Sequence, residues 1–187
     1  MLKSRFQFFG TAAIGFGLAA GTVYLLMARI TLAHIETVSG QVPLDLRPSG
    51  YTFHDVAELF NGLGEDGLRY YLTRQLPLDT LYPALLALTM VCTMCWFGQR
   101  LPNSKLVRTG IALSIGTAVF DYCENLGIAV MIISWPNLSE TLVRLFSVAS
   151  IAKSGLTVLA LVLLFLIALR WIRQRKADVQ QQPPNEN

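Results

Sequence analysis

Four long apolar stretches dominate this chain and restrict what it can fold into. They cover residues 6–28, 80–97, 109–135 and 145–169. Each is close to or above the roughly 20 residues that a helix needs to cross a hydrocarbon core of about 30 Å. Hydrocarbon cannot satisfy open backbone hydrogen-bonding groups, so such stretches have to be helical. We therefore predict an all-α integral membrane protein, with a four-transmembrane-helix bundle in a single domain over residues 1–176.

The composition agrees with a membrane protein. Hydrophobic residues make up 53% of the chain and charged residues only 14%, and the mean hydropathy is +0.48. A soluble domain carries about 25% charged residues, and a disordered chain needs low hydrophobicity. The net charge of +3 comes mostly from Lys and Arg clusters beside the apolar runs, with no basic helix interleaved with aromatic residues. We therefore exclude nucleic acid as a partner.

The first stretch follows Lys3 and Arg5, which is also the arrangement of a signal peptide. Its apolar core is longer than the ~7–15 residues of a signal peptide, and no clear A-x-A cleavage site follows it. We predict a retained span over residues 6–28 and keep the signal peptide as the alternative.

The distribution of Lys and Arg predicts the orientation. One side carries nine of them in short segments: Lys3, Arg5, Arg100, Lys105, Arg108, Arg170, Arg173, Arg175 and Lys176. The other side carries five over residues 29–79 and 136–144: Arg29, Arg47, Arg69, Arg74 and Arg144. Cytoplasmic loops are enriched in Lys and Arg. We expect a bacterial inner membrane with both termini in the cytoplasm, a disordered polar tail over 177–187, and residues 29–79 facing outward.

The outward segment, residues 29–79, is amphipathic. Thr52 and Asp55 resemble a capping box, and the residues after them place one apolar face at helical spacing. That face comprises Phe53, Val56, Ala57, Phe60 and Leu63, then Leu68, Tyr71, Leu72 and Leu76. We expect Gly62 and Gly64 to end a first helix and Pro77 to break a second one. The helices either lie on the outer leaflet or the bundle top, or form a lid over a site that opens outward.

Polar residues gather on one face of each of the last three spans, at 100° per residue. They are Asp79, Tyr82, Thr89, Thr93 and Trp96 in the second span, Ser114, Thr117, Asp121, Glu124 and Asn125 in the third, and Ser147, Ser150, Lys153, Ser154 and Thr157 in the fourth. We expect these three faces to turn toward each other and away from lipid.

Two acids and one lysine lie inside the third and fourth spans. The helical rise places Asp121 and Lys153 at one level in the outer half of the bilayer. A lone charge there costs at least ~2.5–3.5 kcal/mol, so we predict that Lys153 pairs with Asp121, Glu124 or both. These three are the candidate catalytic residues, and the candidate ligand-binding residues are Asp79, Tyr82, Thr117, Asn125 and Ser150. The alternative is that the charges only tie two helices together.

This pattern favours an outward-facing intramembrane site for membrane lipids or for an amphipathic, isoprenoid-like small molecule. An isomerase, a transferase and a pure binding protein all fit it. In architecture alone it resembles the four-span bundles of the emopamil-binding and sigma-2 group, which place carboxylates in a sterol or isoprenoid pocket. The alternatives are a proton-coupled small-solute transporter that acts as a dimer, and an accessory or assembly subunit of a membrane complex.

Small residues in the first span indicate close helix packing. Ala13, Gly17 and Gly21 form a small-xxx-small ridge, which lets helices approach closely. This ridge serves either packing within the bundle or a homodimer through the Gly17 and Gly21 face.

No metal or cofactor is predicted. His54 with Glu58, and His34 near Glu36, give fewer ligands at each place than the three or four of a zinc site.

Cys92 and Cys95 form a CxxC pair. It is similar to the pair of quinone-linked thiol oxidoreductases of the vitamin K epoxide reductase kind. This pair lies at the cytoplasmic end of its span and lacks a second pair to relay electrons, so redox chemistry is a minor alternative.

Overall fold

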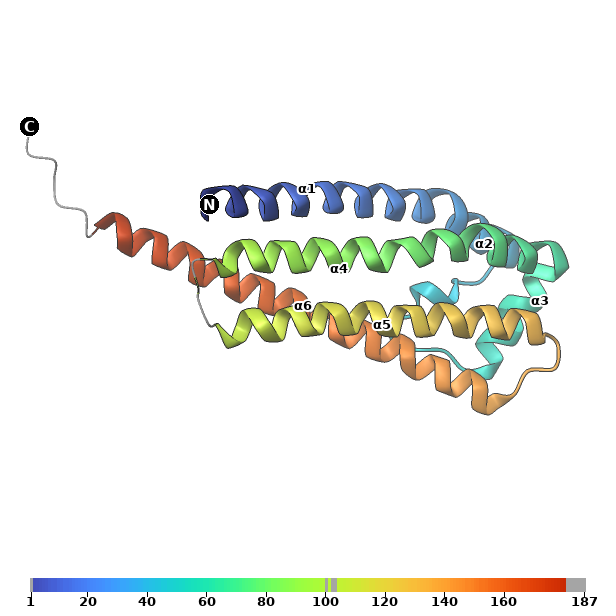
Figure 1. Cartoon of the computed structure of the whole chain (residues 1–187). Coiled ribbons are helices and arrows are strands. Elements are labelled where there is room, and N and C mark those ends of the chain that lie inside the picture. Colours follow the sequence, from blue (N-terminus) through green and yellow to red (C-terminus); the bar gives the residue numbers. More distant parts are fainter. Residues whose placement is uncertain (1, 100, 102–103, 181–187) are drawn as a thin grey trace, which may run out of the picture.

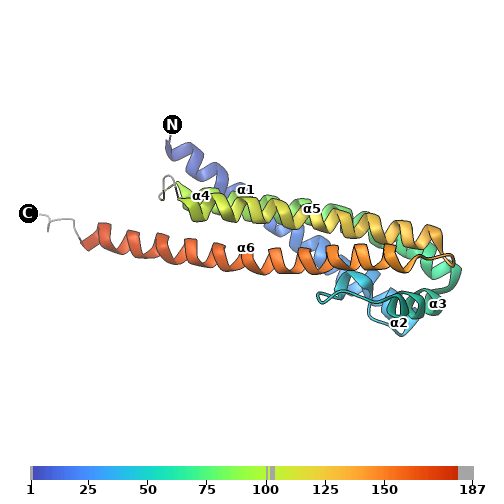
Figure 2. The ribbon, with the colours of Figure 1, turned by 90° about the horizontal axis from the view of Figure 1, so that it is seen from below.

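Four long helices lie side by side and form the body of the protein (Figures 1 and 2). They are α1 (Leu2–Leu26), α4 (Leu76–Gly98), α5 (Lys105–Ser134) and α6 (Glu140–Gln180). The computed structural model describes residues 2–99, 101 and 104–180, and within these ranges every regular element is helical. Four helices are long and apolar enough to cross a membrane. The predicted all-helical class with four long apolar helices is therefore confirmed.

The two ends of the bundle differ. The N-terminus of α1, the connection between α4 and α5, and the C-terminal end of α6 lie at one end, which we call the tail end (Figure 1). At the other end, the capped end, the short helices α2 (Leu32–Ser39), η2 (Leu44–Leu46) and α3 (Phe53–Tyr70) cover the bundle. The N-terminal end of α1 and the C-terminal end of α6 therefore lie on the same side of the four helices. Arg100, one of the residues used for the orientation, lies outside the described residues.

The outward segment is continuous with α1 and α4. The π-helical turns η1 (Met27–Thr31) and η3 (Tyr71–Gln75) join α1 to α2 and α3 to α4 without a gap. The expected break at Pro77 is therefore wrong. Pro77 lies in the first turn of α4, where a residue without an N–H group is tolerated.

The two π turns contact each other through buried side chains. The Thr31 hydroxyl bonds to Gln75 Oε1, and Gln75 Nε2 lies 3.7 Å from Met27 Sδ. Both Thr31 and Gln75 are buried. The two helical connections into the capped end are thus tied to each other as well as to the bundle.

α6 is longer than expected. It continues to Gln180, so residues 177–180 of the predicted disordered tail are helical. The rest of that predicted tail, 181–187, lies outside the described residues.

The outward segment packs on the top of the bundle. One buried cluster joins it to the ends of α5 and α6: Ile35, Leu44, Tyr51, Val56, Leu59, Phe60, Leu63, Leu68, Tyr71, Leu76, Ile128, Met131, Ile132 and Val143. The expected capping box is present, since Thr52 N donates to Asp55 Oδ2 at 2.7 Å and Asp55 N to Thr52 Oγ1 at 3.2 Å. Gly64 kinks α3 at a φ of 61°. Phe53 was expected on the apolar face and is instead 38% exposed.

α1 packs along α4. A Cβ atom on Gly17 would lie 3.4 Å from Thr89 Cγ2, and one on Gly10 would lie 3.1 Å from Trp96 Nε1. Gly17 therefore serves packing within the bundle, whereas Gly21 has no neighbouring atom within 4 Å. Thr89 faces α1, so the expectation that it turns toward α5 and α6 is wrong. Trp96 lies between α1 and α6, since its ring is also 5.2 Å from that of Trp171.

Candidate functional site

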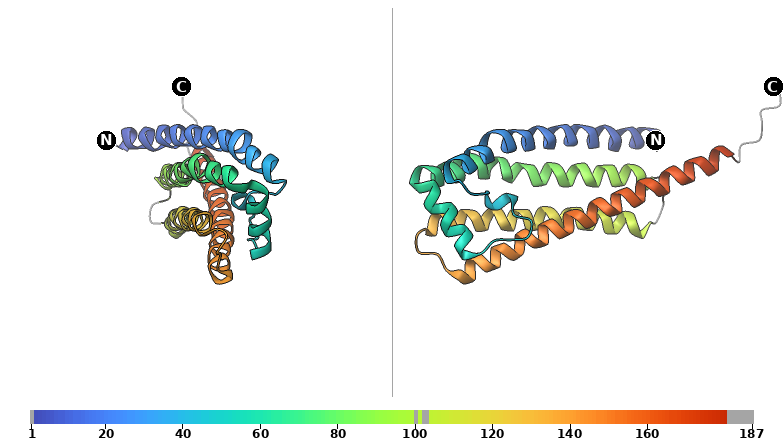
Figure 3. Two further views of the ribbon diagram at one scale, coloured as in Figure 1. Left: turned by 90° about the vertical axis from the view of Figure 1, so that its right-hand side faces the viewer. Right: turned by 180° about the vertical axis from the view of Figure 1, so that it is seen from behind.

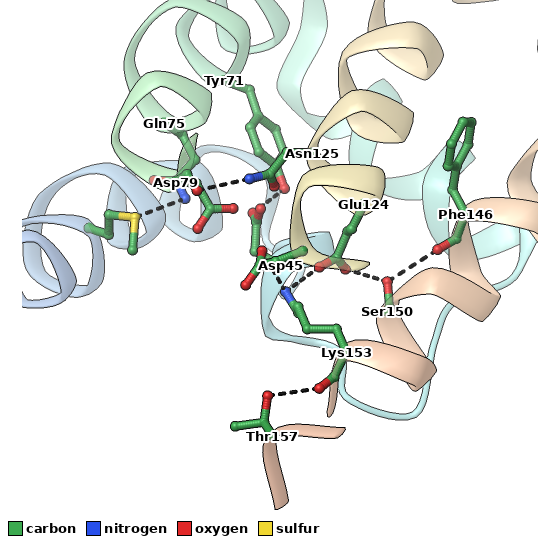
Figure 4. A network of polar contacts seen from close by, with 12 residues as sticks. Asp45, Tyr71, Gln75, Asp79, Glu124, Asn125, Phe146, Ser150, Lys153 and Thr157 are labelled. Carbon is green, nitrogen blue, oxygen red and sulfur yellow. Dashed lines mark hydrogen bonds and ion pairs between the residues drawn. The ribbon is translucent and has the colours of Figure 1, made fainter. Parts of the chain in front are cut away.

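Lys153 of α6 joins two acids of α5 (Figure 4). Its Nζ contacts Glu124 Oε2 and lies 3.4 Å from Asp121 Oδ1. Asp121 and Glu124 lie one helical turn apart, so both reach the same neighbour. Ser150, one turn before Lys153, donates its hydroxyl to Glu124 Oε1. Lys153 is therefore paired with both acids, as we predict from the cost of burying an unpaired charge.

Glycine brings α5 and α6 close enough for these contacts. A Cβ atom on Gly127 would lie only 2.1 Å from Phe146 Cγ, and one on Gly116 would lie 3.4 Å from Leu156 Cδ1. The Phe146 ring thus occupies the space that a larger residue at 127 would need. This close approach positions Ser150 and Lys153, on the turns after Phe146, against the acids of α5.

α4 contributes Asp79 from the opposite side. Asn125 Nδ2 donates to the backbone oxygen of Asp79 at 2.9 Å. Both side chains are almost fully buried, with 5% of Asp79 and 6% of Asn125 exposed. Asp79 was expected at the mouth of an outward-facing site, and the structure places it beneath the capped end.

Asp45 is a member of the site that the sequence analysis missed. It comes from η2, and its carboxyl lies beside that of Asp79 (Figure 4) and accepts the Tyr71 hydroxyl. The only signal in the sequence is that Leu44 and Leu46 flank it in an otherwise polar loop, which is typical of a segment that packs back on the protein. We call Asp45, Asp79, Asp121, Glu124 and Lys153 the carboxyl–lysine cluster.

The loop over residues 40–52 is held against α6. Tyr51 N donates to Ser147 Oγ at 2.8 Å. Gly50 has a φ of +84°, and a Cβ there would lie 2.5 Å from Ser147 Oγ. Burial and the nearby charge of Glu124 raise the pKa of Tyr51 above its ordinary value, so its phenol stays neutral at pH 7. Arg47 pairs with Asp55 at 2.7 Å and fixes the loop to the start of α3.

The structure brings some of the predicted ligand-binding residues to the cluster and not others. Asp79, Asn125 and Ser150 are part of it or contact it. Thr117 is buried, but its hydroxyl bonds to Leu113 O of its own helix at 3.1 Å. Tyr82 lies toward α1, where its ring centroid is 5.8 Å from that of Tyr24.

Two cavities lie away from the cluster. One of about 490 Å³ lies between the kink of α3 and the end of α5, beside Arg69, Ile133 and Trp135. The other, of about 360 Å³, lies between α1 and α4 beside Gly10 and Trp96. Neither of these cavities is lined by a residue of the carboxyl–lysine cluster.

The other candidate chemistry stays separate from the cluster. His54 contacts Glu58 at 3.2 Å on an exposed surface, and Cys92 and Cys95 are free thiols in α4. Within the described ranges, no three His, Cys, Asp or Glu side chains are grouped to hold a metal ion.

Together the fold and the site define a class: an all-helical protein with four helices long and apolar enough to cross a membrane, and a buried carboxyl–lysine cluster near the capped end. Four carboxyl groups that share one lysine can take up protons or hold a cation. No family model, curated protein or solved structure matches the chain.

Proposed function

We propose that the protein is inserted in a bacterial inner membrane through α1, α4, α5 and α6, with the tail end in the cytoplasm and the capped end facing outward. Two features support insertion. α6 exposes a row of large apolar side chains, Leu145, Val148, Val158, Leu161 and Phe165, which a soluble monomer rarely does. Trp96, Phe97 and Trp171 pack together near the tail end, where membrane proteins concentrate aromatic residues.

Thiol labelling in whole cells tests this orientation. In a cysteine-free background, Glu58→Cys at the capped end should react with an impermeant reagent in intact cells. Arg173→Cys at the tail end should react only after permeabilisation. The reverse pattern would contradict the orientation, and labelling of both in intact cells would contradict insertion.

In that membrane, we propose that the cluster binds the polar head of an amphipathic lipid or isoprenoid-like molecule. Asp121 or Glu124 serves as its acid, base or acceptor, and Lys153 is their charge partner. The observation that supports this is the surplus of acid, because the cluster holds four carboxyl groups and one lysine, which contacts only two of them. A structural tie needs only a balanced pair, and polar contacts between membrane helices average only ~0.6 kcal/mol. The Lys153 side chain keeps 15% of its surface exposed, so a head group can approach it from the side.

Co-purification of lipids tests this function. The protein and the variants Glu124→Gln and Glu140→Gln are extracted in native lipid discs, and bound molecules are identified by mass spectrometry. Glu140 is a matched control, since it is an exposed acid of α6 paired with Arg144. We expect Glu124→Gln alone to lose a specific amphipathic species several-fold. Unchanged lipid content with a lower melting temperature would show that the charges only tie the helices.

A proton-coupled transporter is the second candidate, because Asp45 and Asp79 place two neighbouring carboxyls outside the contacts of Lys153. It requires a dimer, for which the exposed Gly21 face is available. Reconstituted vesicles with an internal pH-sensitive dye would show solute-dependent proton uptake that Asp79→Asn abolishes. A dye signal that does not respond to any solute gradient would reject this candidate.

A further inference from the structure

Three buried acceptor oxygens around the cluster have neither a hydrogen-bond nor an ion-pair partner among the described residues: Asp45 Oδ1, Asp79 Oδ2 and Asn125 Oδ1. Glu124 Oε2 also lacks a hydrogen bond but contacts Lys153, and the Tyr51 hydroxyl nearby is a further buried group without a hydrogen-bond partner. Buried polar atoms without partners are rare in folded proteins, and each calls for a water, an ion or a ligand. Asp79 and Asn125 are more than nine-tenths buried. The missing partner has to be a donor, because every one of the three atoms is an acceptor.

The orientation of Asn125 is fixed by its other contact. Its amide nitrogen donates to the backbone oxygen of Asp79, and a carbonyl oxygen can only accept. Asn125 therefore presents its own oxygen, and not its nitrogen, to the unfilled side. Figure 4 shows Asn125, Asp79 and Asp45 gathered on this side of the cluster.

Charge decides what kind of donor fits. Within the described residues, Lys153 is the basic side chain that contacts acids of the cluster. The acids that it contacts are Asp121 and Glu124. Asp45 and Asp79 face each other without such a contact. Asp79 is buried, and burial of an unpaired charge is very costly, so this position favours a cation. Water alone supplies donors but no charge.

The geometry points to a primary ammonium group bound by Asp45, Asp79 and Asn125. An ammonium carries one positive charge and three N–H donors, so it reduces the surplus of negative charge and supplies one donor for each of the three acceptors. The described side chains form no group suited to a metal ion. This inference deepens the proposed function, since it makes the polar head of the bound molecule an amine. The inference depends on the proposed function only in giving the ligand an apolar tail.

Two probes of equal charge and tail length test the ammonium directly. Decylammonium has three N–H donors, and decyltrimethylammonium has none. Binding to the unmodified protein in phosphatidylcholine nanodiscs is measured by calorimetry below the micelle concentration of either probe. We expect decylammonium to bind at least about tenfold more tightly, because each charge-assisted hydrogen bond is worth ~1.5–3 kcal/mol. Equal affinity, or no binding of either probe, would overturn the inference.

Variants locate the site. Asp79→Asn and Asp45→Asn keep the shape of each side chain and should each weaken decylammonium binding about tenfold or more, whereas the control Glu140→Gln should leave it unchanged. Loss of binding in Glu140→Gln as well, or none in the two cluster variants, would contradict the assignment. If Asp79→Asn does not fold, Asp45→Asn and the probe pair on the unmodified protein still decide.

Two further experiments distinguish a small soluble amine from a lipid head group as the source of the ammonium. Competition by methylammonium indicates a small soluble amine. Weaker probe binding in phosphatidylethanolamine than in phosphatidylcholine nanodiscs indicates a lipid head group, and either result supports the ammonium site. If Glu124→Gln loses a co-purified lipid but the probes bind equally, this inference fails and the proposed function stands. If the probes discriminate but no lipid co-purifies, the amine site stands and the proposed function fails.

Discussion

The capped and tail halves of the bundle use the same helices but are stabilised differently (Figure 3). The tail half packs through an apolar cluster with two methionines: Met90, Met94, Leu101, Val107, Ala160 and Ile167. Its buried Ser114 hydroxyl returns to Gly110 O of its own helix at 2.9 Å. The capped half contains ion pairs and hydrogen bonds between helices. Methionine adapts its shape to its surroundings and a buried ion pair does not, so we expect the tail half to tolerate change and the capped half to resist it.

The largest effect is expected for Lys153→Met. It leaves two buried carboxyls without their cation, which typically costs 3–5 kcal/mol when one partner of a buried pair is removed. Unfolding of purified protein in detergent measures the loss. In the background Glu124→Gln with Asp121→Asn, the same substitution should cost much less. An equal loss in both backgrounds would mean that Lys153 stabilises the fold by packing rather than by charge.

A pair of glycines compares the two halves directly. Gly127→Ala at the capped half places a Cβ 2.1 Å from the Phe146 ring, whereas Gly110→Ala at the tail half meets the flexible end of Met94, with Sδ at 2.6 Å. Overpacking of a rigid site typically costs 1–3 kcal/mol. We expect a loss in that range or above it for Gly127→Ala and under ~1 kcal/mol for Gly110→Ala, measured by the same unfolding assay. Equal losses would remove the distinction between the two halves.

A second glycine pair tests how firmly the 40–52 loop is held. Gly40 and Gly50 both have a left-handed φ, but only a Cβ at Gly50 would clash, at 2.5 Å from Ser147 Oγ. The backbone cost of ~1–2 kcal/mol is common to both alanine variants. Amide hydrogen exchange should therefore speed up at Tyr51, whose N–H bonds to Ser147, more in Gly50→Ala than in Gly40→Ala. The same exchange in both would show that this contact does not hold the loop.

The smallest effect is expected for the helix cap. Thr52→Ala removes the capping box of α3, worth ~1 kcal/mol, and should loosen only the capped end in hydrogen exchange. Thr37→Ala is the control, since the Thr37 hydroxyl bonds to Ala33 O within its own helix. A global loss of stability in Thr52→Ala would show that α3 is required for the whole bundle.

The sequence was sufficient for features that one helix specifies on its own. The length of each span and the capping box follow from the local pattern of residues. The pairing of Lys153 follows from the cost of burying an unpaired charge. The face of Thr89 was assigned to the wrong neighbour, because an arc on a helical wheel shows which residues share a face but not which helix packs there. α4 has two packed faces, one against α1 and one against α5. Asp45 was missed because a loop residue has no periodicity to reveal where it folds back.

The paired π turns have a mechanical consequence. They connect α1 and α4 to the covering helices as unbroken rods, and the Thr31–Gln75 contact couples the two rods. Torque on α2 or α3, for instance from a molecule that docks on them, is transmitted along α1 and α4 instead of being absorbed in a flexible linker. The loop over residues 40–52 is not part of either rod and is held from the side, by Arg47 to α3 and by Tyr51 to α6, so movement of the covering helices would reach Asp45 through these contacts.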